Sequence, residues 1–126
     1  MHERSLVKAL IAQVASLANA QQASRAIEVR VRVGPLTGVE PLLLSSAFAD
    51  LANTALFNGA RITVIEVPLR AHCRECEAVF NVDNFHFRCA VCGSPDVETI
   101  DGDALILESV DFALAAEEEP AYGDGF

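Results

Sequence analysis

The sequence predicts an α+β fold, in which two helices cover a small three-stranded sheet and a four-cysteine domain is inserted into that core. Apolar residues recur at helical spacing in two segments and cluster or alternate as in strands in three others. All four cysteines fall between the second and the third of those strands. A chain of 126 residues that is 52% hydrophobic has enough apolar side chains for one core of this size.

The chain opens with a segment that favours a helix, followed by one that favours a strand. Apolar residues recur every three to four positions up to about Ala23, which predicts a helix with one apolar face formed by Leu6, Leu10, Val14 and Leu17. This face is widened by Val7, Ile11 and Ala18. Strict alternation of apolar and polar residues from Ile27 to Val33 then predicts a strand with one buried face.

The second half of the core repeats this order. Pro41 suits the first turn of a helix, and Gly59 offers the stop that ends it. Residues 62–69 are rich in β-branched side chains and predict a second strand. After the cysteines, the Asp-Gly-Asp turn at 101–103 leads into a third strand at 104–112.

This reading divides the chain into three parts. Residues 1–70 together with 101–112 form the α/β core, and residues 71–100 form a loop-like cysteine domain inserted between the last two strands. Residues 113–126 carry acidic side chains without a basic one, as well as helix-breaking proline and glycine. We expect this acidic tail to be disordered.

The cysteines form two Cys-x-x-Cys pairs whose spacing predicts a zinc-ribbon-like metal site. Each pair can turn two sulfurs inward in a tight turn, and two such turns supply a tetrahedral set of four sulfurs, namely Cys73, Cys76, Cys89 and Cys92. Zinc suits this ligand set, while an iron site of the rubredoxin type uses the same ligands and stays open. Four thiolates leave no coordination position for a reactive water, so we predict a structural metal and no enzyme.

Charge argues against nucleic acid and membrane partners. The net charge of the chain is -9, and residues 71–98 hold two arginines against five acidic residues. A phosphate backbone or an anionic lipid surface would be repelled. The remaining alternative for the cysteine domain is a zinc-ribbon module that binds other proteins or, less in keeping with its charge, nucleic acid.

From its first residues we expect no signal for export. The chain has no apolar run approaching the roughly 20 residues that span a bilayer, and its charged start does not resemble a signal peptide. Two thiol pairs of this spacing are typical of a reducing compartment. We therefore expect a cytoplasmic protein.

The amino terminus offers a second metal site. The amine of Met1, the backbone nitrogen of His2 and a ring nitrogen of His2 can bind one ion in a plane, and such nitrogen sets favour Ni(II) or Cu(II). The alternative is a histidine that is simply solvated at a chain end. Glu3 could likewise belong to the site or be an acid favoured in the first turn of a helix.

Three motifs in this order resemble the HypA/HybF family of hydrogenase maturation nickel metallochaperones. They are Met1-His2-Glu3-x-Ser5-Leu6, Gly34-x-Leu36-x-Gly38-Val39-Glu40-Pro41 and the two cysteine pairs. The resemblance extends to about residue 112 and leaves out the acidic tail.

The resemblance implies a non-enzymatic carrier with two metals. It assigns His2, with Met1 and the neighbouring Glu3, to the nickel site, and the four cysteines to structural zinc. It places Glu40 beside the nickel region. As partners it implies the GTPase HypB and the large subunit of [NiFe]-hydrogenase, and some family members also serve urease.

Overall fold

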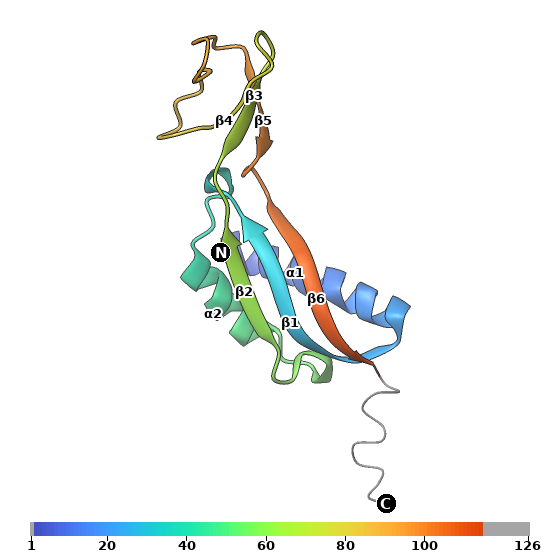
Figure 1. Cartoon of the computed structure of the whole chain (residues 1–126). Helices are drawn as coiled ribbons and strands as arrows, with labels where there is room; N and C mark the ends of the chain where they lie inside the picture. The colour runs from blue at the N-terminus through green and yellow to red at the C-terminus, as the bar shows by residue number, and fades with distance from the viewer. Residues whose placement is uncertain (1, 115–126) are drawn as a thin grey trace, which may run out of the picture. The chain divides into compact units, whose positions relative to one another are not determined.

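The structure is a computed structural model that describes residues 2–114. The elements in chain order are α1 (His2–Gln21), β1 (Ala23–Val33), the short 3-10 helix η1 (Pro35–Thr37), α2 (Pro41–Leu51), η2 (Ala55–Phe57), β2 (Arg61–Glu66), β3 (Arg70–Cys73), β4 (Val79–Asn81), β5 (Val97–Asp101) and β6 (Leu105–Leu114). The strands form two three-stranded sheets with the orders β2-β1-β6 and β4-β3-β5 (Figure 1). The predicted α+β class is confirmed.

The chain divides into two compact units. Of the described residues, unit 1 contains 2–31, 40–64 and 107–114, and unit 2 contains 32–39 and 65–106. Unit 2 is thus wider than the cysteine domain expected at 71–100. The acidic tail expected at 113–126 lies outside the described residues, apart from its first two, which belong to β6.

Unit 1 is the predicted core, with both helices on one face of the β2-β1-β6 sheet (Figure 1). Strands β1 and β6 run in opposite directions. Phe48 of α2 meets Phe57 edge to face, with ring centroids 5.9 Å apart. The core is filled by Val7, Leu10, Val14, Ala18, Ala26, Val29, Val31, Leu44, Ala47, Phe48 and Phe57.

The buried face of α1 is narrower than the predicted one. Leu10, Val14, Val7 and Ala18 are buried as expected, but Leu17 is 37% exposed and Leu6 is only partly buried. All of these residues have helical spacing, and packing against the sheet and α2 decides which of them are covered. Gln22 then adopts a left-handed conformation with φ 57, which ends the helix and lets β1 begin at Ala23 rather than Ile27.

Two further boundaries differ from the prediction. Helix α2 ends at Leu51 and is followed by the separate turn η2, so it does not run on to Gly59. Strand β2 ends at Glu66, before Pro68, because proline cannot donate a hydrogen bond to a neighbouring strand.

The prediction of a loop-like cysteine insertion is wrong, because unit 2 contains a sheet of its own. Strand β3 pairs antiparallel with both β4 and β5, so that Ala71 lies opposite Phe80 on one side and Thr99 on the other. A small apolar core formed by Leu69, Ala71 and Val82, with Phe80 and Val97 against it, supports this sheet. Strands of three to five residues are too short to show an alternating pattern in the sequence.

Two glycines in unit 2 allow their backbones to touch. A Cβ atom on Gly34 would lie 2.0 Å from the carbonyl oxygen of Gly102. That same oxygen accepts a hydrogen bond from the Leu36 N–H at 3.3 Å, so neither backbone segment is free to move away. This contact explains why glycine is needed at position 34.

We predict that Gly34→Ala destabilises the protein by about 3 kcal/mol, at the upper end of what overpacking costs, because the clash is with backbone atoms. Urea unfolding measures the loss. Gly38→Asn is the matched control, since a Cβ there meets nothing within 4 Å and asparagine tolerates its left-handed backbone. Equal stability of the two variants would contradict the prediction.

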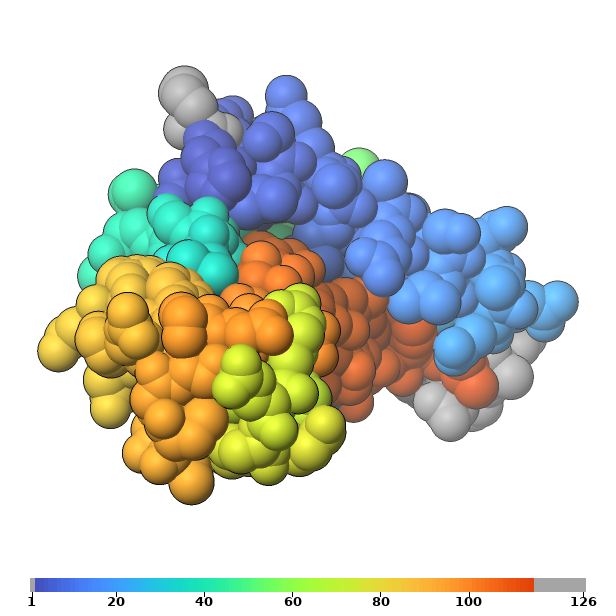
Figure 2. Space-filling view, turned by 90° about the horizontal axis from the view of Figure 1, so that it is seen from above, coloured from blue at the N-terminus to red at the C-terminus, as the bar shows by residue number. Residues whose placement is uncertain are grey.

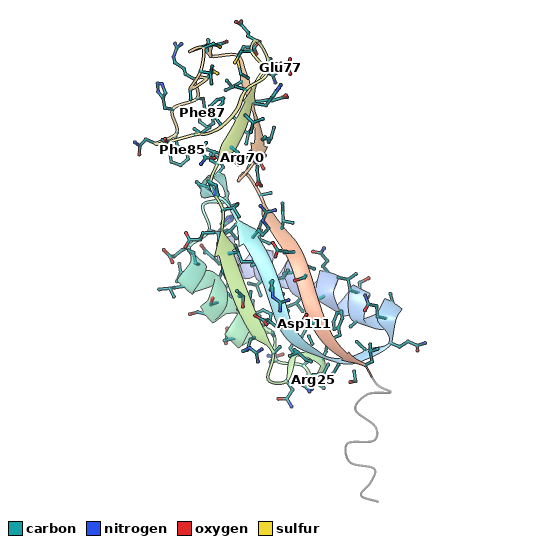
Figure 3. The ribbon with its side chains drawn as sticks, viewed as in Figure 1. Arg25, Arg70, Glu77, Phe85, Phe87 and Asp111 are labelled. Atoms are coloured by element: carbon teal, nitrogen blue, oxygen red, sulfur yellow. The ribbon has the colours of Figure 1, made fainter. Side chains whose placement is uncertain are left out.

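The face of the β2-β1-β6 sheet turned away from the helices carries a charged network (Figures 1 and 3). Arg30 binds Asp111 at 2.8 Å and Glu28 at 3.1 Å. The Thr63 hydroxyl donates a hydrogen bond to Glu28 and, together with the nearby Arg30 and Arg61, lowers the pKa of Glu28 below its ordinary value of 4.5.

This network predicts acid sensitivity. Because the pKa of Glu28 is lower in the folded chain than in the unfolded one, its ionised form stabilises the fold above pH 4.5, and this contribution is lost as the pH falls through the folded value. Glu28→Gln should therefore be less stable than the parent chain at neutral pH, and the difference should shrink towards about pH 3. Urea unfolding at both pH values checks this, and a pH-independent difference would contradict it.

Candidate metal centre

The two Cys-x-x-Cys segments fold into matching turns. In the first, the N–H of Glu77 donates to the carbonyl of Cys73 at 2.9 Å, and in the second the N–H of Gly93 donates to the carbonyl of Cys89, also at 2.9 Å. Glu77 and Gly93 occupy the same place in each turn and both have a left-handed backbone, with φ 68 and 79. Each turn therefore brings two cysteine side chains to the same side.

Backbone N–H groups point at the sulfur atoms in both turns. The N–H of Cys76 donates to Cys73 Sγ at 3.4 Å, and the N–H groups of Cys92 and Val91 donate to Cys89 Sγ at 3.3 Å each. The Cys92 N–H, followed by that of Val91, lowers the pKa of Cys89 to about 6. Hydrogen bonds of this kind favour the thiolate, which is the form that binds metals.

The four sulfurs fit a tetrahedral ion. Cys76 Sγ lies 3.5 Å from Cys89 Sγ, Cys73 Sγ lies 3.7 Å from Cys92 Sγ, and all four lie within 4.8 Å of one another. Metal–sulfur bonds of about 2.3 Å would place tetrahedral sulfurs about 3.8 Å apart. No disulfide joins them. Within residues 2–114, this is the one group of three or more cysteine, histidine or acidic side chains arranged to hold an ion.

His72 lies next to the cluster but faces carboxylates. Its Nδ1 is 3.0 Å from Glu98 and its Nε2 is 3.0 Å from Glu77, which lies in the turn after β3 (Figure 3). Glu77 and then Glu98 raise the pKa of His72 by hydrogen bonding to its ring. With both ring nitrogens engaged, His72 supports the first turn and offers no ligand to the sulfur cluster.

The residues expected at the nickel site lie at the start of α1. His2 is the first residue of this helix and is exposed, and its carbonyl accepts a hydrogen bond from the Ser5 hydroxyl at 3.0 Å. The first N–H groups of a helix have no acceptor within the helix, so the helical hydrogen bonds do not use the backbone nitrogen of His2. Met1 lies outside the described residues.

Glu3 joins the starts of the two helices. Its side chain is only 9% exposed, and its carboxylate accepts a hydrogen bond from the backbone N–H of Glu40 at 3.0 Å, which lowers the pKa of Glu3. Glu40 in turn caps α2, because its carboxylate accepts from the Leu42 N–H at 3.0 Å. The start of α1 accordingly lies beside the start of α2 (Figure 2). No local sequence pattern indicates this link across 37 positions.

This link predicts different effects for two substitutions. Glu3→Ala removes the acceptor of the Glu40 N–H, whereas Glu3→Gln keeps an oxygen in its place. Hydrogen exchange of the Glu40 amide should therefore become about tenfold faster in Glu3→Ala, the effect of losing one hydrogen bond, and change less in Glu3→Gln. Unchanged exchange in both variants would contradict the role of Glu3 as an anchor.

The surface beside Glu3 is open and partly apolar. A hollow of about 360 Å³ is lined by Glu3, Arg4, Leu43, Ser46, Ala47 and Asp50. Arg4 binds Asp50 at 2.8 Å across it. Leu42 and Leu43 are 77% and 55% exposed. On the first turn of α1, His2, Arg4 and Ser5 are thus exposed, while Glu3 is buried.

Comparison with known proteins identifies the family. The sequence pattern of the family described as "Hydrogenase/urease nickel incorporation, metallochaperone, hypA" matches residues 1–112. The chain belongs to the HypA family. The "Hydrogenase maturation factor HypA" of Shewanella oneidensis is 31% identical over 117 residues, covering 93% of this chain and 99% of the relative. The protein of the same name from Desulfitobacterium hafniense is 30% identical over 111 residues, covering 88% and 97%.

A solved HypA structure has the same fold. The solution structure of the "Ni metallochaperone HypA from Helicobacter pylori" superposes with a TM-score of 0.72 at 26% identity, covering 90% of this chain and 99% of that one. HypA relatives are named for maturation and metal delivery rather than for a catalysed reaction. Among the residues that the structure describes, no helix is both long and apolar enough to cross a membrane.

Proposed function

We propose that this HypA chain carries Ni(II) at its amino terminus and delivers it for the maturation of [NiFe]-hydrogenase or, as in some of its family, urease. The observation that carries the proposal is the match of the nickel-incorporation family over residues 1–112, which includes Met1, His2 and Glu3. The proposed ligands are the Met1 amine, the His2 backbone nitrogen and a His2 ring nitrogen. Ni(II) favours such nitrogen sets.

The placement of His2 and Glu3 supports this assignment. The exposed His2 ring leaves its metal open to exchange with another protein. Glu3 is turned towards the Glu40 N–H, so we propose that it positions the first turn of α1 and does not itself bind nickel. Release of the cargo then requires no unfolding of unit 1.

We propose that the sulfur cluster holds structural Zn(II), bound by Cys73, Cys76, Cys89 and Cys92. Zinc supplies a cross-link between the two turns, and the closed set of four sulfurs leaves no position for a hydrolytic water. The chain is on this view a carrier and not an enzyme. Elemental analysis of untagged protein separates zinc from the iron alternative.

The proposed partners are HypB and the [NiFe]-hydrogenase large subunit. The exposed Leu42 and Leu43 offer apolar area for a protein contact close to the first turn of α1. The net charge of -9 argues against a nucleic acid in this role.

A transfer experiment tests the function. Untagged chain is loaded with one equivalent of Ni(II), mixed with immature hydrogenase large subunit, with and without HypB, and separated by size. With the nickel-loaded chain, nickel should appear in the large-subunit fraction. When free Ni(II) and a strong chelator replace the loaded chain, less nickel should appear in that fraction. Nickel that stays on the chain in the presence of both partners would overturn the proposal.

A further inference from the structure

We propose that hydrogen peroxide, or another hydroperoxide, oxidises the cysteine cluster at its two exposed cysteines and joins the sulfur of each to that of the buried cysteine in the opposite turn. The products would be the disulfides Cys76–Cys89 and Cys73–Cys92, with release of the bound metal. The inference rests on the metal cluster proposed above and is independent of nickel delivery.

Accessibility differs between the two cysteines of each turn in the same way. Cys73 and Cys89, the first cysteine of each pair, are 0% and 4% exposed. Cys76 and Cys92, the second of each pair, are exposed. A bound ion holds all four sulfurs as thiolates, so access decides which of them a peroxide reaches and oxidises. The structure thus points to Cys76 and Cys92 as the sulfurs attacked.

The partners of these sulfurs follow from the distances within the cluster. Exposed Cys76 lies 3.5 Å from buried Cys89, and exposed Cys92 lies 3.7 Å from buried Cys73. Each contact crosses from one turn to the other. A disulfide bond is about 2.05 Å long, so each pair must close by about 1.5 Å. Because the ion bonds to both sulfurs of a pair, closing the pair to a disulfide displaces the ion from both.

The reaction balances with the peroxide as oxidant. The Cys76 thiolate attacks one peroxide oxygen, the O–O bond breaks, and hydroxide leaves and takes up a proton, so that Cys76 becomes a sulfenic acid. The Cys89 thiolate then attacks the Cys76 sulfur, the S–S bond forms, and a second hydroxide leaves as water. Two thiolates lose two electrons, and hydrogen peroxide with two protons becomes two waters. Cys92 and Cys73 react with a second peroxide in the same way.

The first disulfide should already release the metal. Two of the four thiolates are consumed, and the remaining pair, Cys73 and Cys92, cannot complete a tetrahedral sulfur site. Metal release should therefore keep pace with the first disulfide rather than with the second.

Tryptic cleavage of the full chain separates a disulfide between the turns from one within the first turn, and fragmentation of the linked peptides in the mass spectrometer distinguishes Cys89 from Cys92. Cleavage after Arg70, Arg74 and Arg88 gives peptide 71–74 with Cys73, peptide 75–88 with Cys76, and peptide 89–126 with both remaining cysteines. A bond between the turns links 75–88 or 71–74 to 89–126. A bond within the first turn links 71–74 to 75–88 instead.

The experiment treats the metal-loaded wild-type chain with less than one equivalent of hydrogen peroxide, blocks free thiols with iodoacetamide and maps the unreduced peptides by mass spectrometry. A zinc-binding dye follows the metal. We expect 75–88 linked to 89–126 through Cys89, or 71–74 linked through Cys92, with metal released in step. Chain oxidised in guanidinium with a chelator is the control, and it should also give the 71–74 to 75–88 link.

Several results would overturn the inference. They include a first link between 71–74 and 75–88, metal release without any disulfide, and faster iodoacetamide labelling of Cys73 or Cys89 than of Cys76 or Cys92 in the untreated loaded chain. Metal content measured before oxidation keeps the proposals apart. A purified chain without zinc would refute the zinc assignment. The relative rates at which iodoacetamide labels the four cysteines would still test whether Cys76 and Cys92 are the more accessible ones.

Discussion

Replacing His2 with alanine is expected to abolish nickel binding and leave the zinc content unchanged. The substitution removes the ring nitrogen, one of three proposed nitrogen ligands, and should weaken nickel binding by more than about 100-fold. The helix should remain, because the side chain is exposed and alanine favours helices. Elemental analysis after dialysis against Ni(II), together with circular dichroism, measures both effects.

A control histidine and a blocked terminus sharpen this test. His86→Ala is the matched control, because His86 is also exposed but lies in unit 2. Extending the chain by a few residues before Met1 should have the same effect as His2→Ala, since it removes the free amine. Nickel retained at one equivalent in either His2→Ala or the extended chain would refute the amino-terminal site.

The second large effect is expected for Cys73→Ala, which should release the zinc and unfold unit 2. The core of that unit consists of three buried residues and two partly buried ones, too few to fold a domain of this size alone. Structural zinc contributes an apparent 10–16 kcal/mol, roughly, in small domains of this kind. Hydrogen exchange should rise across β3, β4 and β5 while α1 keeps its protection.

The matched control for Cys73→Ala is Val91→Ala, in the second cysteine turn. Val91 is 75% exposed, so its truncation costs little packing and leaves all four sulfurs in place. Zinc content and exchange should match those of the parent chain. A Cys73→Ala chain that keeps its zinc and its protected β3 would show that unit 2 folds without the cluster.

Long periodic segments made the core of unit 1 predictable from sequence. The two helices and strands β1, β2 and β6 were all expected, and the largest difference in a boundary is at α2, which ends at Leu51 and not near Gly59. The buried face of α1 was predicted too wide, because Leu6 and Leu17 have the same helical spacing as the buried Val7 and Ala18. Only the packing partner distinguishes them, and a partner distant in sequence leaves no mark on the local pattern.

The site was predictable where its chemistry is local. Two Cys-x-x-Cys pairs define their own turns, so the sulfur cluster followed from spacing and is present. The hydrogen bond from Glu40 to Glu3 joins two helix starts far apart in the chain, and neither residue signals it. The role of His2 in nickel binding stays a prediction.

The two cysteine turns differ at one equivalent position in a way that matters for how the sequence evolves. Gly93 adopts its left-handed conformation without a side chain in the way, whereas Glu77 adopts the same conformation at a cost of about 1 kcal/mol or more. Glu77 is also one of the two carboxylates that hold the His72 ring. Substitution at position 77 therefore has two opposing effects, since glycine would relax the main chain but remove the partner of His72 Nε2, while a β-branched residue would satisfy neither demand.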